Sequence, residues 1–183
     1  MRGIITHFDS ERLLFSEITW DDLEDIYNLH RMPEVDEFNT LGIPENINIT
    51  REVIRPAIED QKNSSRKLFC WSISIKESKK FIGVSGLTLS AERFRMGEIY
   101  YSLDPHYWND GLGTEAAKAL IDFGFLILKL HRINAGVAVT NKRSIRVLEK
   151  AGMKREALHR KILPIRGVWT DNYEYAVLED DPR

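Results

Sequence analysis

The stretch Tyr107-Trp108-Asn109-Asp110-Gly111-Leu112-Gly113-Thr114-Glu115-Ala116 decides the fold, because a strand pattern precedes it and a long helical pattern follows it. Two glycines at the junction let successive backbone N–H groups converge without interference from a Cβ atom. A helix that opens at about Thr114 adds its free N–H groups and the positive end of its dipole. The stretch therefore predicts a turn that binds an anion such as a phosphate.

Two well-known phosphate-binding loops do not fit this stretch. A P-loop requires Gly-Lys-Ser or Gly-Lys-Thr, and neither follows Gly113. A dinucleotide-binding turn requires a third glycine, which residues 109–116 lack. Because a Gly-x-Gly pair before a helix is often only a tight turn, the surrounding sequence must decide between a plain turn and a different phosphate site.

Three strands are predicted before this turn. Residues 68–75 alternate large apolar and small side chains, and residues 81–89 follow after a charged turn. This pattern is typical of an antiparallel hairpin. Residues 97–103 continue the same sheet, so the anion-binding turn follows the end of a strand.

The segments after the turn alternate between helix and strand. Residues 114–130 carry apolar side chains on nearly every face, which predicts a helix buried against the sheet. Residues 132–139 form the next strand, and a right-handed crossover should place it parallel to residues 97–103. Residues 141–151 predict a second helix, closed by Gly152.

The N-terminal part predicts one strand and two helices. Residues 12–18 read as the strand, and Thr19-Trp20-Asp21-Asp22 supplies helix-start chemistry for a segment that runs to about His30. Pro33 should close that helix. Residues 49–63 have helical spacing, with Pro56 kinking the helix or starting its second half.

A final hairpin, residues 154–163 and 169–178, completes the pattern. The element order β-α-α-β-β-β-α-β-α-β-β predicts a mixed α/β fold, in which one twisted sheet of six to seven strands is flanked by about four helices. With 183 residues, 43% of them hydrophobic, we expect a single domain over residues 1–183.

Composition argues against two classes of partner. The formal net charge of −2 and the pI near 6.2 give no overall attraction to nucleic acid, and residues 155–161 with Arg166 are the only densely basic stretch. Residues 1–10 lack an apolar run of signal-peptide length, and the apolar run within residues 123–130 is too short to span a bilayer. We therefore expect a cytoplasmic protein that binds neither nucleic acid nor membrane.

Cysteine and histidine usage predicts no metal and no disulfide. Cys70 is the only cysteine, and its place in an alternating strand favours packing over nucleophilic chemistry. The five histidines show no metal-ligand spacing. They are His7, His30, His106, His131 and His159.

Several motifs in order resemble the GNAT superfamily of acyl-CoA-dependent N-acetyltransferases. The central motifs are Glu98-Ile99-Tyr100-Tyr101-Ser102-Leu103, Trp108-x-x-Gly111-x-Gly113-Thr114-Glu115-Ala116, Arg132-Ile133 and Asn141-x-x-Ser144-x-x-x-Leu148-Glu149-Lys150-x-Gly152-Met153. The outer motifs are Glu11-Arg12-Leu13-Leu14, Thr19-x-x-Asp22-Leu23 and Gly167-x-Trp169-x-Asp171-x-x-x-Tyr175-Ala176. The chain is most similar to the branch that acetylates ribosomal-protein N-termini, the RimJ/RimL-like enzymes, and the likeness covers about the whole chain.

The resemblance implies a site for acetyl-CoA and no metal. In the family the strand matching residues 98–103 splays from the strand matching 132–139, and pantetheine binds the freed strand edge. The N–H groups of residues 108–114 would then hold the pyrophosphate. The implied cofactor-binding residues are Tyr101, Ser102, Leu103, Trp108, Asn109, Asp110, Gly111, Leu112, Gly113, Thr114, Asn141 and Ser144.

The resemblance also implies two catalytic residues. Glu98 matches the general base of related acetyltransferases, although an ion-paired strand-end carboxylate and a water relay stay open as alternatives. The tyrosine that serves as the acid in many family members is replaced here by Leu148, which cannot donate a proton. Ser144 is similar to the serine proposed for that role in the ribosomal branch, and an ordinary first-turn serine is the alternative.

The acceptor is the least determined part. The resemblance implies a primary amine, foremost a peptide N-terminus, with a polyamine, an amino-sugar or an antibiotic as alternatives, and it leaves room for a homodimer. The acidic residues Glu34, Asp36 and Glu37 can attract a cationic amine, although solvated loop acids explain them as well. Because Leu148 removes the usual acid, a catalytically silent CoA-binding sensor is a further alternative.

Overall fold

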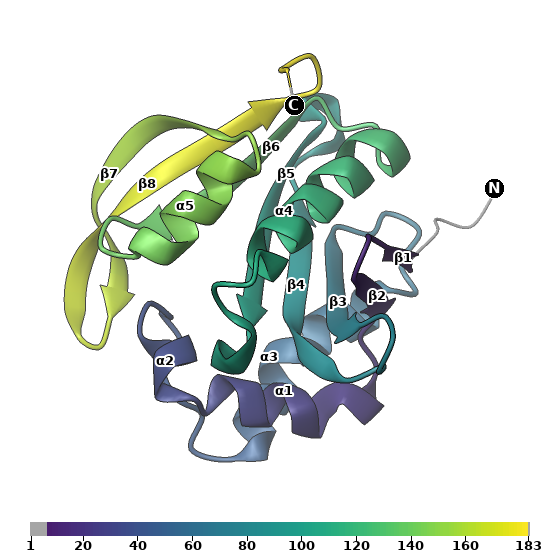
Figure 1. Cartoon of the computed structure of the whole chain (residues 1–183), viewed down its shortest axis with the longest axis vertical. Coiled ribbons are helices and arrows are strands. Elements are labelled where there is room, and N and C mark those ends of the chain that lie inside the picture. The colour runs from purple at the N-terminus through teal and green to yellow at the C-terminus, as the bar shows by residue number, and fades with distance from the viewer. Residues whose placement is uncertain (1–6, 183) are drawn as a thin grey trace.

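The computed structural model describes residues 7–182, and its centre is an eight-stranded sheet in the order β1-β2-β3-β4-β5-β6-β8-β7 (Figure 1). The strands are β1 (Phe8–Asp9), β2 (Leu13–Glu17), β3 (Leu68–Ile75), β4 (Phe81–Leu89), β5 (Met96–Leu103), β6 (Arg132–Ala138), β7 (Lys154–Ile165) and β8 (Val168–Leu178). Neighbouring strands are antiparallel except β5 and β6, which run parallel. The predicted parallel pair and both predicted hairpins, β3–β4 and β7–β8, are confirmed.

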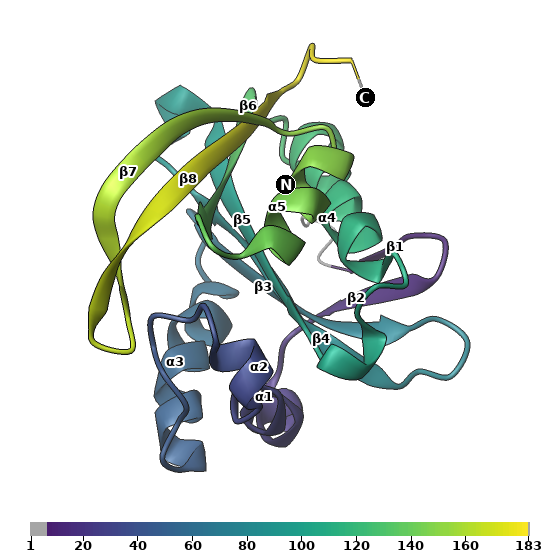
Figure 2. The same cartoon turned by 60° about the vertical axis from the view of Figure 1, so that its left-hand side comes forward.

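Helices cover both faces of the sheet. They are α1 (Leu23–His30), α2 (Pro33–Asp36), α3 (Ile47–Asp60), α4 (Leu112–Asp122) and α5 (Lys142–Lys150). Helices α4 and α5 lie on one face, whereas α1, α2 and α3 lie toward the other (Figures 1 and 2). The predicted mixed α/β fold is therefore confirmed, with slightly more strands and helices than expected.

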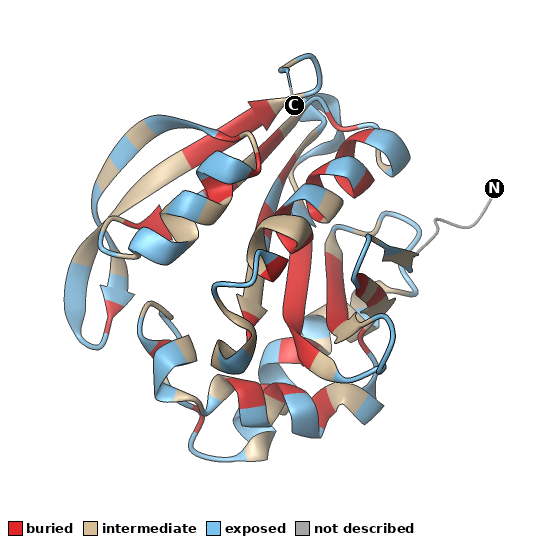
Figure 3. Cartoon of the chain, in the orientation of Figure 1, coloured by how far each residue is buried: buried red, intermediate tan, exposed pale blue. Residues whose placement is uncertain are grey.

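Two apolar clusters hold these layers together, and strand alternation explains why there are two. In β3 the side chains of Phe69 and Trp71 join the larger cluster, on the face covered by α4, whereas Cys70 points to the smaller cluster beneath α1 and α3. Trp71 and Phe123 meet edge to face, with ring centroids 5.0 Å apart. Buried residues accordingly concentrate on the central strands and on the sheet side of α4 (Figure 3).

The helix predicted over residues 114–130 has different bounds. It begins two residues earlier, at Leu112, and its α-helical part ends at Asp122. A π-helical stretch, Phe123–Ile127, continues it, and there the N–H of Leu128 donates to the carbonyl of Phe123. Apolar residues on nearly every face predict burial, but they conceal such a change of pitch because no single stripe marks the period.

The N-terminal part also differs from the expectation. Strand β1 was not predicted, because two residues carry no period. Pro33 lies after the end of α1, as expected, but it also occupies the first turn of α2, where its fixed φ and missing N–H fit a helix start. The expected absence of a signal peptide concerns residues 1–10, of which 1–6 lie outside the described part.

The feature that positions the site is the divergence of β5 and β6. Their parallel pairing covers only Met96 with Arg132, Gly97 with Ile133 and Glu98 with Asn134. Strand β5 then runs on to Leu103 beside β4, while β6 runs on to Ala138 beside β8. The edge of β5 beyond Glu98 is thus not paired with β6, and such an edge can pair with an extended ligand.

Candidate functional site

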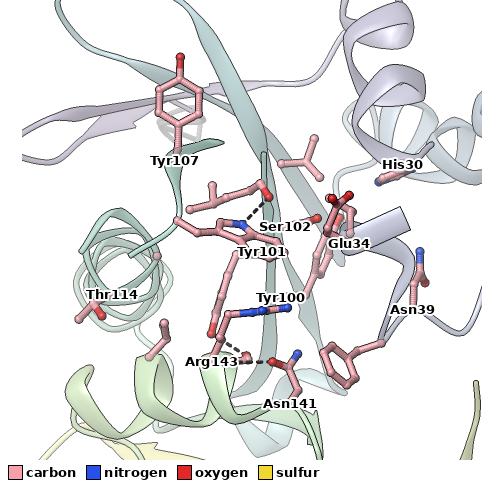
Figure 4. A pocket seen from close by; sticks show the side chains of 18 of the residues that line it. His30, Glu34, Asn39, Tyr100, Tyr101, Ser102, Tyr107, Thr114, Asn141 and Arg143 are labelled. Carbon is pink, nitrogen blue, oxygen red and sulfur yellow. Dashed lines mark hydrogen bonds between the residues drawn. The ribbon is translucent and has the colours of Figure 1, made fainter. Parts of the chain in front are cut away.

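A cavity of about 660 Å³ lies where β5 and β6 diverge (Figure 4). Tyr100 and Tyr101 both line it, although their side chains leave β5 on opposite faces of the sheet. One part of its wall comes from the turn before α4 and from α5, and another part comes from α1, α2, α3 and the segment before α3. The cavity therefore reaches both faces of the sheet.

The turn before α4 has the backbone geometry of an anion-binding site. Asn109 and Gly111 take left-handed conformations, with φ of 65° and 80°. Gly111 is the N-cap residue of α4, so the free N–H groups of the first helical turn follow it directly. Gly113 is helical instead, and a Cβ there would lie 3.4 Å from Val147 of α5, in ordinary contact.

Most of the predicted cofactor-binding residues line this cavity. They are Tyr101, Ser102, Leu103, Trp108, Asn109, Gly111, Gly113, Thr114, Asn141 and Ser144. Leu112 is instead buried in the core. Asp110 is exposed, and its backbone carbonyl accepts a hydrogen bond from Arg12.

Arg12 and Glu115 fasten the turn to strand β2. The Nε of Arg12 donates to Glu115 Oε2 at 2.7 Å, and its Nη1 donates to the Asp110 carbonyl at 3.0 Å. Glu115 also accepts from the Ser10 hydroxyl and from the Arg12 backbone N–H, both at 2.7 Å. Burial works against the Glu115 carboxylate, but these hydrogen bonds outweigh it and lower its pKa.

Ser144 meets Tyr101 inside the cavity. The two hydroxyl oxygens are 2.9 Å apart, and either group can be the donor. Asn141 caps α5 by accepting a hydrogen bond from the backbone N–H of Ser144 at 3.1 Å. Burial raises the pKa of Tyr101 to about 12, so this phenol keeps its proton throughout the neutral range. Leu148, at the position of the usual acid, is fully packed in the core.

Tyr100 forms part of the cavity floor on the opposite face. Its ring lies over Gly86, where a Cβ would come within 2.2 Å of the ring, and its hydroxyl donates to Cys70 Sγ at 3.1 Å. Burial raises the pKa of Cys70 to about 11, so the thiol stays protonated and unreactive at neutral pH. Cys70 is therefore a packed residue, as the sequence predicts.

Glu98 lies beside the cavity without lining it. It occupies the last position of β5 that pairs with β6, two residues before Tyr100 on the same face of the sheet. Protein surroundings that withdraw water from its carboxylate raise its pKa, and the charge of Glu174 raises it further. Such a carboxylate accepts a proton at a higher pH than a free glutamate does.

The three acidic residues around α2 have different environments. Asp36 is buried and accepts from Arg166 at 3.3 Å, and Glu37 pairs with Arg143 at 2.9 Å. Glu34 lines the cavity, and within residues 7–182 it has no hydrogen bond or ion pair. Figure 4 places it on the side of the cavity formed by α1 and α2, opposite Thr114 and Asn141.

Sequence reasoning missed the roles of two groups. Arg12 and Glu115 stood out only as parts of motifs, and their contact joins residues 103 positions apart, which no local period reveals. His30 and Arg143 line the cavity, and the Arg143 guanidinium also lies 4.4 Å from the centre of the Trp108 ring. A cation beside an aromatic face is a recognised contact, but its partners must first be brought together by the fold.

Residues 7–182 contain neither a metal-binding cluster nor a membrane-spanning helix. No group of three or more His, Cys, Asp or Glu side chains in this range is arranged to hold a metal ion. No helix in the described part is both long and apolar enough to cross a membrane.

Three known proteins are similar over nearly their whole length. An uncharacterised N-acetyltransferase of Bacillus subtilis, YnaD, is 29% identical over 177 residues, which is 96% of this chain and 98% of the relative. A spermidine N-acetyltransferase of Vibrio cholerae, solved with CoA and spermine, has a TM-score of 0.82 at 21% identity and covers 93% of this chain and 97% of its own. A ribosomal-protein-S5-alanine acetyltransferase of Vibrio fischeri has a TM-score of 0.81 at 24% identity, with 97% and 98% covered. The two structures share the fold.

A family model decides the assignment. The acetyltransferase (GNAT) domain matches residues 12–154, from Arg12, directly before β2, to the start of the final hairpin. The match contains the diverging strands, the anion-binding turn and the helix of Ser144. This chain therefore belongs to the GNAT acetyltransferases, enzymes that use acetyl-CoA to acetylate an amine.

Proposed function

We propose that this enzyme acetylates the N-terminal amine of a peptide, as the RimJ/RimL-like branch does, by direct attack within a ternary complex. The observation that carries the proposal is the cavity that reaches both faces of the sheet beside an anion-binding turn. Donor and acceptor can then enter from different faces and meet at the diverging strands. The similar structure named as a ribosomal-protein alanine acetyltransferase supports this acceptor class.

The residues around the turn fit acetyl-CoA, which supplies an acetyl group activated as a thioester. The N–H groups around Asn109 and Gly111 are suited to the pyrophosphate. The edge of β5 around Tyr101 is suited to the extended pantetheine, because a strand edge that is not paired with another strand offers donors and acceptors. At its end, the Leu103 carbonyl already accepts from the Trp108 indole N–H at 2.8 Å. Asn141, the N-cap residue of α5, lines the same side of the cavity.

Ser144 is proposed to protonate the departing thiolate. Its hydroxyl lies in the cavity and is held by Tyr101, whose raised pKa keeps a proton available to replace the one that Ser144 gives up. The pair thus takes over the function that Leu148 cannot perform. No covalent bond between the enzyme and the acetyl group is required.

Glu98 is proposed to accept the proton of the attacking amine through water. Its place beside the cavity wall favours a relay over direct contact. Its raised pKa makes it a better proton acceptor than an ordinary surface glutamate at neutral pH.

A small amine is the second candidate acceptor. The similar spermidine N-acetyltransferase, solved with spermine, supports it. Both candidates are tested by release of free thiol from acetyl-CoA with a panel of peptides, polyamines and amino-sugars. Thiol release that depends on one acceptor class would assign the substrate. Tight CoA binding with no turnover on any amine would identify a CoA-binding sensor instead.

Arg12→Gln should raise the KM for acetyl-CoA about two- to fivefold at unchanged kcat, because the pair with Glu115 holds the anion-binding turn and interactions at helix ends are worth about 0.3–1 kcal/mol. Steady-state kinetics check this. Arg55→Gln is the matched control, since Arg55 is similarly exposed and paired with Glu52 but does not line the cavity. An unchanged KM in the Arg12 variant would show that the turn keeps its geometry without the ion pair to Glu115.

A further inference from the structure

The cavity wall contributed by α1, α2, α3 and the segment before α3 is mostly apolar. Seven of the ten residues in this part of the wall are apolar. The three polar residues are His30, Glu34 and Asn39 (Figure 4). Val53 of α3 and Leu41 are exposed members of the apolar part, with 41% and 66% of their surface accessible. A ligand on this side therefore meets a predominantly apolar surface.

Among residues 7–182, Glu34 is the only carboxylate that lines this wall. Asp36 is neutralised by Arg166 and Glu37 by Arg143, so neither offers a free charge. Glu34 has no partner within residues 7–182 and faces the cavity. The wall can therefore attract one positive charge.

The other polar groups nearby add no negative charge. Burial lowers the pKa of His30, which keeps its imidazole neutral at physiological pH. The side-chain oxygen of Asn39 accepts from the backbone N–H of Leu41, and the Tyr100 hydroxyl is engaged with Cys70. From α5, Arg146 and Lys150 contribute positive charges to the cavity.

We infer that the acceptor is an amine with a single positive charge and an apolar group beside it, and not a polyamine. Glu34 attracts the ammonium group, and the apolar wall removes the adjacent group from water. A second ammonium would lose its hydration without gaining a carboxylate partner, and it would be repelled by the cations of α5. This inference rests on the proposed acetyl transfer to an amine and specifies its substrate class.

The test compares acceptors that differ in one group. Free thiol release from acetyl-CoA is measured with three peptides that begin with Leu, Asp or Lys and are otherwise identical, and with spermidine. We expect kcat/KM for the Leu peptide to exceed each of the other values at least about tenfold, as apolar pockets commonly discriminate. Equal values, or a preference for spermidine, would overturn the inference while leaving acetyl transfer intact. Absence of turnover with any amine would overturn the proposed function and the inference with it.

A pair of variants tests the apolar wall directly. Val53→Asp adds a second carboxylate to the cavity at an exposed position and should raise kcat/KM for spermidine relative to the Leu peptide at least about tenfold. Ile49→Asp places the same charge one helical turn earlier on α3, at a position of 47% exposure that does not line the cavity, and should leave this ratio unchanged. If both variants or neither shift the ratio, the apolar wall does not select the acceptor.

Discussion

Ser144→Ala is expected to lower kcat for acetyl transfer by about 10²- to 10³-fold, with little change in the KM for acetyl-CoA. Positioned proton donors contribute about this much to a rate, and the Ser144 hydroxyl is held in the cavity by Tyr101 at 2.9 Å. Alanine keeps the helix cap, because the bond to Asn141 uses the backbone N–H of residue 144. A loss of rate is therefore attributable to the hydroxyl. Steady-state kinetics and thermal unfolding of parent and variant check both points.

Tyr101→Phe tests whether Tyr101 and Ser144 act together in the proton transfer. If Tyr101 supplies the proton that Ser144 gives up, the double variant should be no slower than Ser144→Ala alone. Because burial raises the pKa of Tyr101 to about 12, the parent should also show no loss of kcat from this group between pH 7 and 10. A Ser144→Ala enzyme with full kcat would leave the serine as an ordinary residue of the first helical turn.

Gly111→Ala should raise the KM for acetyl-CoA by about 10- to 100-fold. The left-handed φ of 80° costs an alanine about 1–2 kcal/mol, so the turn relaxes and its N–H groups leave the phosphate. Loss of one hydrogen bond to a charged group, about 1.5–3 kcal/mol, corresponds to this range of KM. Crowding is not the cause, since the nearest atom to an added Cβ is Arg12 Nη2 at 3.5 Å.

Gly167→Ala is the control for that substitution. Gly167 has a φ of 76° in the turn between β7 and β8, and nothing lies within 4 Å of an added Cβ. The Gly167→Ala variant should therefore carry the same backbone strain without a change in the KM for acetyl-CoA. S-acetyl-pantetheine, which lacks the phosphates, gives a second readout, because Gly111→Ala should affect it much less than acetyl-CoA. Equal losses with both donors would place the pyrophosphate elsewhere.

Regular elements were predictable because their patterns are local. The bounds predicted for the strands 68–75 and 81–89 agree with β3 and β4. Alternation of large and small side chains specified both. The same reasoning could not find α2 or the π-helical stretch after Asp122, because four or five residues carry too little periodicity.

The candidate site was predictable in its backbone and less so in its side chains. The turn at Gly111 was identified because two glycines before a helical pattern leave a local signature, and Asn141 was identified because it opens a family motif. The contact between Tyr101 and Ser144 joins residues 43 positions apart, and the exclusion of Glu98 from the cavity wall depends on where the strands separate. Such relations arise only when the sheet has formed.

The origin of the cavity wall along the chain divides the enzyme into exchangeable parts. The part of the wall that α1, α2, α3 and the segment before α3 form comes from one continuous segment, residues 26–57. The anion-binding turn and α5 lie between residues 107 and 150. Replacement of the first segment would change which acceptor is recognised and leave the handling of the donor untouched. Asp36 and Glu37 would need to be kept, because their ion pairs with Arg166 and Arg143 join α2 to the rest of the molecule. Ile26, Leu29 and Ile54 would need to be kept as well, because they are buried in the smaller apolar cluster with residues of β3 and β4.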